Sequence, residues 1–119
     1  MRDEIMWWMS RITIMLTSLF LSFSLAAQAY AAEIQMGYEG NLVFEPNEVT
    51  VNAGETVTFV NNALPPHNII FDKFASLSRE SLMFTPGETQ EIKFATAGDY
   101  DFKCAPHEGA GMKGVIHVK

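Results

Sequence analysis

The sequence predicts an all-β fold, a sandwich of two sheets built from seven to eight short strands. Segments rich in β-branched and aromatic residues alternate apolar with polar positions, which is typical of strands that bury one face. Turn-forming Pro, Gly and Asn residues separate these segments at short intervals. The 88 residues from 32 to 119, which remain after an N-terminal leader, are enough for one domain with one modest core.

The N-terminal leader has the features of a secretory signal peptide. Charged residues and two tryptophans occupy 2–11, and a run of Ile, Leu, Met and Phe broken only by Ser and Thr follows over 12–25. This run is shorter than the ~18 apolar residues expected of a membrane span. Ala29-Tyr30-Ala31 then provides a small-x-small cleavage step. We therefore assign 1–31 to a cleaved signal peptide and 32–119 to the mature domain.

In chain order, the first three expected strands cover 34–36, 48–51 and 56–61. The turn motifs Glu45-Pro46-Asn47 and Asn52-Ala53-Gly54 precede the second and the third. In the third strand Val57 and Phe59 alternate with polar residues and share one face.

The later strands are expected over 68–71, 91–94, 99–104 and 114–118. Turns at Pro65-Pro66, Thr85-Pro86-Gly87 and Thr96-Ala97-Gly98 lead into the first three of them. Alternation gives a common face to Tyr100, Phe102 and Cys104, and another to Ile116 and Val118. Residues 73–82 lack the alternating strand pattern, which predicts a short helical turn or an irregular loop there.

Charge and cysteine content narrow the possible functions. The mature chain has 6 Lys/Arg and 12 Asp/Glu, a net charge of −6. This charge argues against nucleic-acid binding, because phosphate contacts need a basic surface. Cys104 is the only cysteine, so it cannot form an internal disulfide. A free thiol in an exported protein suggests a metal ligand.

Potential metal ligands are concentrated in a loop near the C-terminus, Cys104-Ala105-Pro106-His107-Glu108-Gly109-Ala110-Gly111-Met112. Its Pro and Gly residues let the backbone curl, so that a thiolate, an imidazole and a thioether can face one centre. His67, which follows Pro65-Pro66, supplies a second imidazole. Two His and one Cys with a distant axial Met form the blue-copper arrangement, whereas zinc normally takes a fourth strong ligand. The pattern predicts one copper ion at His67, Cys104, His107 and Met112.

Each of these residues, taken alone, also has an ordinary structural interpretation. A lone Cys is often a small core residue, a Met fills gaps in the core, and a His beside Pro commonly lies in a surface loop. Core packing does not require the Cys-x₂-His-x₄-Met spacing with its glycines, which favours the metal site. His117 alternates with Ile116 and Val118, so we expect it to face solvent and not to bind metal.

The segment Pro66-His67-Asn68-Ile69-Ile70-Phe71-Asp72, together with the 104–112 loop, resembles the plastocyanins over essentially all of 32–119. The segments 40–46 and 60–63 match the same family. Pseudoazurins share the loop spacing, and it is the segment beginning at His67 and the short chain that favour plastocyanin. The resemblance implies a Greek-key, cupredoxin-like sandwich.

The resemblance also implies a function. It indicates a soluble, monomeric one-electron carrier rather than an enzyme, with one type 1 copper ion that alternates between Cu(I) and Cu(II). The implied donor is cytochrome f of the cytochrome b6f complex and the implied acceptor is photosystem I, at the lumenal side of the thylakoid membrane. The implied copper ligands are again His67, Cys104, His107 and Met112. The single secretory-type signal points to the cyanobacterial type.

Further residues take roles from the same resemblance. Asn68 is expected to tie the strand of His67 to the Cys104 loop. An apolar patch around the solvent-facing edge of His107 is expected from Leu42, Pro66, Gly109 and Ala110. Pro46 and Pro66 match positions where members of the family carry cis peptide bonds.

Lys103 departs from the family, which usually has Tyr before the cysteine ligand. Alternation places Lys103 outward with Asp101. The acidic cluster of plant members is reduced to Asp72. We therefore expect docking through the apolar end rather than charge-steered docking at the side.

Two other function classes are disfavoured. A copper oxidase or nitrite-reducing domain needs additional His ligands, and the chain has three His in total. A copper-delivery protein tends to have Met- and His-rich tracts, whereas the mature chain has three scattered Met residues.

Overall fold

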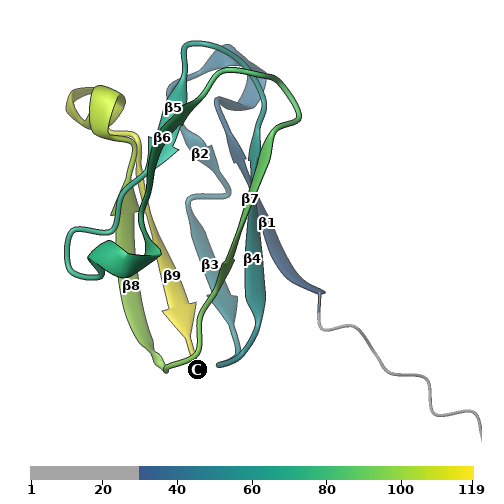
Figure 1. The fold of residues 1–119 in the computed structure, drawn as a ribbon, viewed down its shortest axis with the longest axis vertical. Coiled ribbons are helices and arrows are strands. Elements are labelled where there is room, and N and C mark those ends of the chain that lie inside the picture. The colour runs from purple at the N-terminus through teal and green to yellow at the C-terminus, as the bar shows by residue number, and fades with distance from the viewer. Residues whose placement is uncertain (1–29) are drawn as a thin grey trace, which may run out of the picture.

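The computed structural model describes residues 30–119, and it arranges them as strands and short helical turns in two layers (Figure 1). The elements are β1 (Tyr30–Met36), η2 (Tyr38–Gly40), β2 (Phe44–Glu45), β3 (Glu48–Val51), β4 (Thr56–Asn61), β5 (His67–Ile69), η3 (Ala75–Leu77), β6 (Arg79–Met83), β7 (Thr89–Lys93), β8 (Gly98–Lys103), η4 (Ala105–Ala110) and β9 (Lys113–Val118). None of the helical turns in this part of the chain is long and apolar enough to cross a membrane. The predicted leader lies outside the described residues, apart from Tyr30 and Ala31, whose backbone belongs to β1.

The strands form the two-sheet sandwich that the sequence predicts. One sheet has the order β2-β1-β4-β7 and the other the order β3-β9-β8, while β5 and β6 pair with each other. A bridge between Ile70 and Lys103 joins the β5–β6 pair to β8. Figure 1 shows β8 and β9 in one layer and β1, β4 and β7 in the other, with the turn η4 at the end of the sandwich opposite the C-terminus.

The core fills the space between the layers through side chains at alternating positions. Tyr100, Phe102 and Cys104 are all buried, as their alternation along β8 predicts. The Phe102 ring packs edge-on against Phe44 and Phe59, with ring centroids 4.7 and 5.3 Å apart. Such edge-to-face contacts add about 0.5–1.5 kcal/mol per pair beyond the burial of apolar area. Phe102 thus anchors β8 in the core two residues before Cys104.

The sequence-based prediction missed two strands. β2 spans only two residues, too few to show any alternation. β6 occupies part of the segment 73–82, where a helical turn or loop was expected; only the turn η3 fits that expectation. Met83 alone is buried in β6, so its sequence lacks a strand pattern. Its pairing with β5, with His67 opposite Met83, makes it a strand.

Two proline peptide bonds are cis, Glu45–Pro46 and Leu64–Pro65. The prediction for Pro46 is confirmed. The prediction for Pro66 is wrong, because the cis bond lies one residue earlier, before Pro65. Each of the two adjacent X–Pro bonds has only a weak intrinsic preference for trans, so local sequence does not distinguish between them.

Candidate metal centre

The four predicted ligands come from two segments at one end of the sandwich, the strand of His67 and the loop 104–112. His67 is the first residue of β5, Cys104 directly follows β8, and His107 lies in η4. Met112 lies between η4 and β9. Because the core holds β5, β8 and β9, it fixes the backbone on both sides of the ligand loop.

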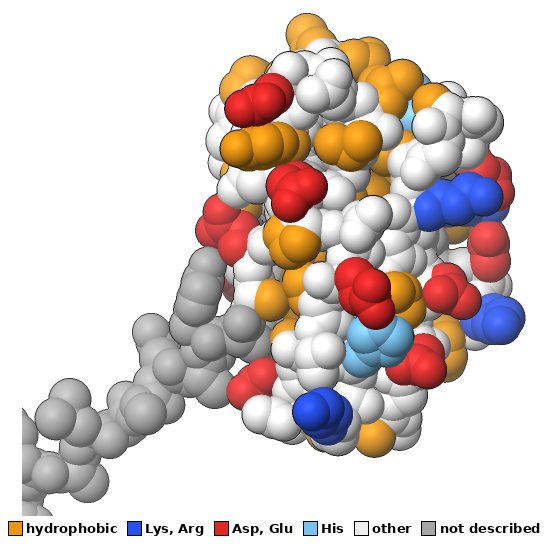
Figure 2. All heavy atoms as spheres, turned by 180° about the vertical axis from the view of Figure 1, so that it is seen from behind, with side chains coloured by type: hydrophobic (Ala, Val, Ile, Leu, Met, Phe, Trp, Pro, Cys, Tyr) orange, Lys and Arg blue, Asp and Glu red, His pale blue; other side chains and the backbone are white. Residues whose placement is uncertain are grey.

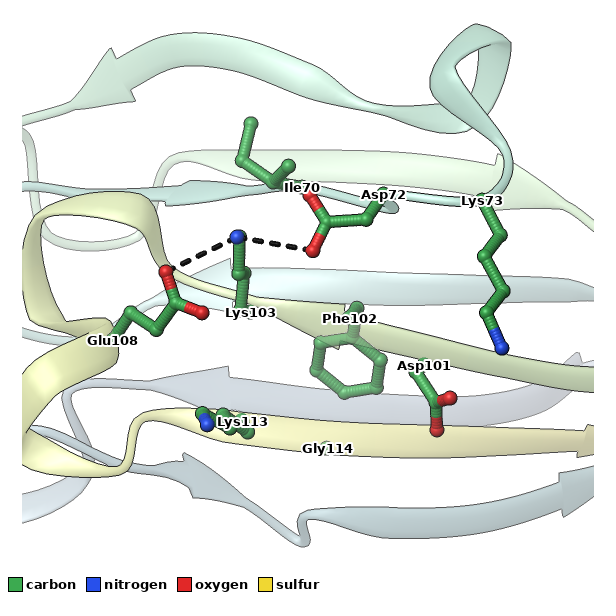
Figure 3. Close-up of a pocket in the computed structure, with 9 residues that line it drawn as sticks. All are labelled: Ile70, Asp72, Lys73, Asp101, Phe102, Lys103, Glu108, Lys113 and Gly114. Carbon is green, nitrogen blue, oxygen red and sulfur yellow. Dashed lines mark ion pairs between the residues drawn. The ribbon is translucent and has the colours of Figure 1, made fainter.

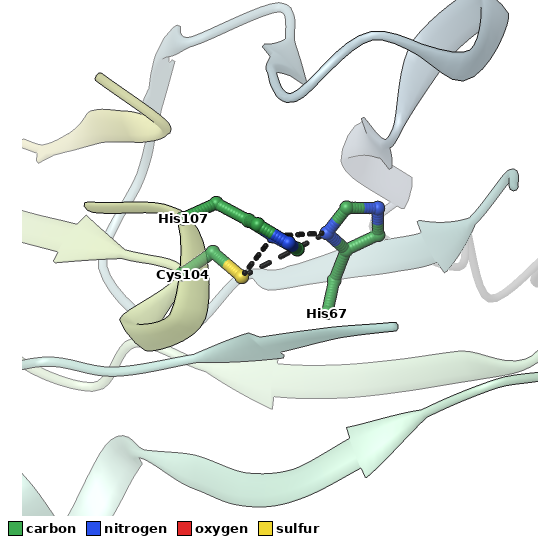
Figure 4. Close-up of side chains that lie close together, drawn as sticks. All are labelled: His67, Cys104 and His107. Carbon is green, nitrogen blue, oxygen red and sulfur yellow. Dashed lines mark hydrogen bonds between the residues drawn. The ribbon is translucent and has the colours of Figure 1, made fainter. Parts of the chain in front are cut away.

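Three of these side chains converge on one point (Figure 4). The His67 Nδ1 and His107 Nδ1 atoms are 3.2 Å apart. Cys104 Sγ lies 3.3 Å from His107 Nδ1 and 3.7 Å from His67 Nδ1. Bonds of ~2.0 Å to imidazole nitrogen and ~2.3 Å to thiolate sulfur place the ligand atoms of one ion roughly 3–4 Å apart. The donor triangle therefore has the dimensions of a metal site.

His67 is fully buried, and its Nε2 edge lies close to the backbone of Gly37. Nε2 has no hydrogen bond of good geometry among the described residues. A Cβ added to Gly37 would lie 2.6 Å from Nε2 and 2.9 Å from the Ala63 carbonyl oxygen, so only glycine leaves room for the ring. Burial, followed by the charge of His107, lowers the pKa of His67, while Ala63 acts in the opposite direction. A neutral imidazole is the form that binds metal.

The Cys104 thiol is free and fully buried. Burial raises its pKa, and interactions with the backbone of Asn68 and His107 oppose the shift. Without a cation this thiol stays protonated, which makes it a poor nucleophile. A bound metal ion would deprotonate it outright. The donor set of two imidazoles and one thiol, close to a thioether in sequence, suits copper.

Met112 is held in the loop by its backbone. Its carbonyl oxygen accepts a hydrogen bond from the Cys104 N–H at 3.0 Å, and its N–H donates to the His107 carbonyl at 3.3 Å. The Met112 side chain is fully buried within the core cluster. Its role as axial ligand stays a prediction.

Asn68 ties the strand of His67 to the loop, as expected. Its Oδ1 accepts a hydrogen bond from the Ala105 N–H at 2.8 Å, and its Nδ2 donates to the Glu80 carbonyl at 3.2 Å. Asn68 is itself buried. This bridge fixes β5 relative to the residue that directly follows Cys104.

The predicted docking residues lie near the surface. His107, Leu42 and Pro66 are half-buried, while Gly109 and Ala110 are exposed. Leu64, in the loop before His67, is 57% exposed. Figure 2 shows hydrophobic side chains gathered at the upper end of the molecule. The opposite end carries more acidic and basic side chains in the same view.

Lys103 points outward, as expected, but it is not free. Its Nζ forms ion pairs with Asp72 and Glu108 at one side of the ligand loop (Figure 3). Hydrogen bonds to Asp72, and then to Glu108, raise the pKa of Lys103. Neither these ion pairs nor the Gly37 contact was predicted from the sequence. A glycine directly after a strand was the one available hint of a close backbone approach.

His117 lies apart from the centre and does not join it. Among the described residues, the potential metal-binding group comprises His67, Cys104 and His107. His117 Nε2 lies 2.7 Å from Glu48 Oε1, and Nδ1 lies 2.6 Å from Asp99 Oδ1. The prediction that His117 faces outward is confirmed.

Comparison with known proteins agrees with this geometry. Residues 31–119 match the family model described as copper binding proteins of the plastocyanin/azurin family. The chain is 53% identical to plastocyanin of Scenedesmus fuscus over 88 residues, which cover 67% of this chain and 90% of the relative. It is 47% identical to chloroplastic plastocyanin of Tetradesmus obliquus over 106 residues, covering 82% and 73% respectively. A solved structure of a mutant fern plastocyanin superposes with a TM-score of 0.67 at 35% identity, covering 73% of this chain and 99% of that one.

Proposed function

This chain belongs to the plastocyanin/azurin family of copper-binding proteins, and on that premise we propose that it carries single electrons with one type 1 copper ion held by His67, Cys104, His107 and Met112. When bound, copper supplies the Cu(I)/Cu(II) couple. The observation that carries the proposal is the convergence of the buried Cys104 Sγ with the Nδ1 atoms of both histidines.

The surroundings of the ligands suit electron transfer. A carrier works fast when its site changes little between oxidation states, and a close-packed interior resists such change. Hydrogen bonds from Cys104 to Met112 and from Ala105 to Asn68 fix both sides of the loop. Four protein donors leave no position for a substrate. The chain therefore acts as a carrier and not as an enzyme.

The electron leaves and enters through His107 in this proposal. His107 is the less buried of the two imidazoles, and small exposed residues, Gly109 and Ala110, follow it. An exposed apolar surface on a small protein commonly marks an interaction site, and weak redox complexes bury small areas. With Leu42 and Pro66, these residues would form the docking surface.

The partners follow from the family. The relatives named above are plastocyanins, and the one from Tetradesmus obliquus is chloroplastic. We propose cytochrome f as the electron donor and photosystem I as the acceptor. The protein would be a monomer in the thylakoid lumen, peripheral to the membrane. Residues 1–31 would be the cleaved export signal, and 32–119 the mature carrier.

Reduction of photosystem I by the purified copper protein tests the whole proposal. The oxidised protein should be intensely blue, and it should reduce flash-oxidised photosystem I at a rate that rises with its concentration. An oxidised copper complex that is colourless, or a blue protein that does not reduce photosystem I, would contradict it.

Leu42→Glu tests the docking surface separately. It should leave the visible spectrum and the reduction potential nearly unchanged but slow electron transfer by about tenfold or more, because an unpaired carboxylate is costly to desolvate in a contact. The defect should persist at high salt. Thr96→Glu adds the same charge just before the start of β8, far along the strand from Cys104, and serves as the control. Equal rates for parent and Leu42→Glu would place the exit elsewhere.

A further inference from the structure

Lys103 connects the two segments that contain the predicted ligands. Its Nζ lies 3.0 Å from Asp72 Oδ2 and 3.1 Å from Glu108 Oε2 (Figure 3). Asp72 lies on the segment that leaves β5, the strand of His67. Glu108 directly follows His107 in η4. A single ammonium group therefore bonds one carboxylate from each segment.

The backbone of Lys103 makes the same connection. Its N–H donates to the Ile70 carbonyl at 3.0 Å, and its carbonyl accepts from the Ile70 N–H at 2.9 Å. Within the described part of the chain this bridge is the strand pairing that joins β5 and β6 to β8. The next residue, Cys104, is bonded through its N–H to Met112. The ion pairs thus add a link at the surface, beside the backbone link.

An ordinary exposed ion pair contributes little, because ordering two long side chains offsets most of the attraction. Lys103 differs in that its side chain is only 21% exposed and bonds two carboxylates at once. The entropy cost of ordering one Lys side chain is therefore offset by two ion pairs rather than one. Lys73 and Lys113 line the same recess, yet neither forms an ion pair within the described residues. Figure 3 shows Lys73 extending away from the pair of carboxylates.

We propose that Lys103 is a positioning residue, which holds the loop of Cys104 and His107 against the segment of His67 through Glu108 and Asp72. This inference rests on the proposed function, since it concerns the geometry of the same site. A loop held from its outer side as well as by the core keeps its donor atoms in place when the oxidation state changes.

Hydrogen exchange in the protein freed of copper tests the link without relying on the metal. Lys103→Met and Glu108→Gln each break the link to the loop. We expect either substitution to raise the exchange rates of the His107, Gly111 and Met112 amides by roughly two- to fivefold, with β1 and β4 unchanged. Lys103→Arg should restore the parental rates. Lys73→Met, in the same recess, should leave them unaltered.

The reduction potential of the copper-loaded variants separates positioning from a simple charge effect. A charge effect alone would lower the potential in Lys103→Met and raise it in Glu108→Gln, because a lost positive charge favours the oxidised ion and a lost negative charge disfavours it. Loop exchange would then stay parental. Positioning predicts faster loop exchange and a shifted thiolate-to-copper absorption band in both variants.

Parental exchange rates in both variants would overturn the inference, whatever their potentials. A parent protein that binds copper without becoming blue would instead overturn the proposed function. The two failures are distinguishable, because the exchange experiment is done without copper.

Discussion

Histidines occupy two contrasting clusters in this protein. At the metal centre, the fully buried His67 faces a sulfur atom and a second imidazole, and burial lowers its pKa. On the outer face of the β3-β9-β8 sheet, His117 lies between two carboxylates. Hydrogen bonds to Asp99, and then to Glu48, raise the pKa of His117. The two clusters therefore favour opposite protonation states of the same side chain.

The difference shows what makes a histidine available to a metal. A neutral imidazole keeps a nitrogen lone pair for coordination, whereas an imidazolium has none. His67 Nδ1 faces the Cys104 sulfur and the His107 ring, and burial, followed by the charge of His107, disfavours its charged form. His117 has a carboxylate at each ring nitrogen, which favours the charged form. Burial and neighbouring charge, more than the presence of histidine, decide which cluster can bind copper.

The largest effect is expected when the sulfur is removed from the buried cluster. Cys104→Ser should abolish the strong visible absorption of the copper protein, because a hydroxyl cannot provide the thiolate-to-copper charge transfer. Absorption spectra at equal copper loading measure this. His117→Gln serves as the control from the other cluster and should keep the full band. A blue Cys104→Ser protein would remove Cys104 from the ligand set.

Gly37→Ala should perturb the buried cluster by crowding the His67 ring. Its Cβ would overlap His67 Nε2, and its φ of +74° disfavours any side chain. Gly40→Ala is a matched control, since φ is +79° there but no atom lies within 4 Å of an added Cβ. Both should lose ~1–2 kcal/mol of unfolding free energy from backbone strain. Gly37→Ala should lose roughly 1–3 kcal/mol more, through the displaced ring.

Urea unfolding of the metal-free variants gives these free energies, and the visible band of the copper-loaded forms reports on the site. Only Gly37→Ala should shift the band. Equal unfolding free energies and equal spectra in the two variants would show that the close approach of Gly37 to His67 is unimportant.

Met112→Leu should have a smaller effect, on the potential rather than on the colour. A thioether is a weak axial donor that favours Cu(II), so its replacement by an isosteric apolar side chain should raise the reduction potential. Voltammetry of the purified protein measures the shift. Met83→Leu, at another fully buried methionine, is the control. An unchanged potential in Met112→Leu would exclude Met112 as a ligand.

The smallest effect is expected from the exposed cluster. Because the folded-state pKa of His117 is raised above its ordinary value near 6.5, its contribution to stability is complete below about pH 6.5 and is lost as pH rises through the raised pKa. The midpoint temperature of thermal unfolding of the parent should therefore fall slightly, relative to that of His117→Gln, as pH rises from about 6.5 through the raised pKa of His117. A difference that grows with rising pH would have the wrong sign for a protonated His117.

Much of the fold was predictable because it follows from local pattern. Alternation along β8 and β9 correctly predicts that Phe102 and Ile116 are buried and that Lys103 and His117 point outward. β3 and β4 have the predicted bounds. β6 was not predictable, because only one of its residues is buried and it shows no alternation. It is a strand because the fold places it beside β5, with which it pairs.

The candidate site divides in the same way between sequence and tertiary structure. The sequence alone determined the donor types and their spacing, because Cys104, His107 and Met112 lie in one short loop and His67 follows a distinctive Pro-Pro turn. By contrast, the room that Gly37 leaves for the His67 ring and the ion pairs of Lys103 with Asp72 and Glu108 depend on the folded arrangement of the chain. These contacts join residues distant in the chain, and no local propensity encodes them. The packing of the two sheets brings them together.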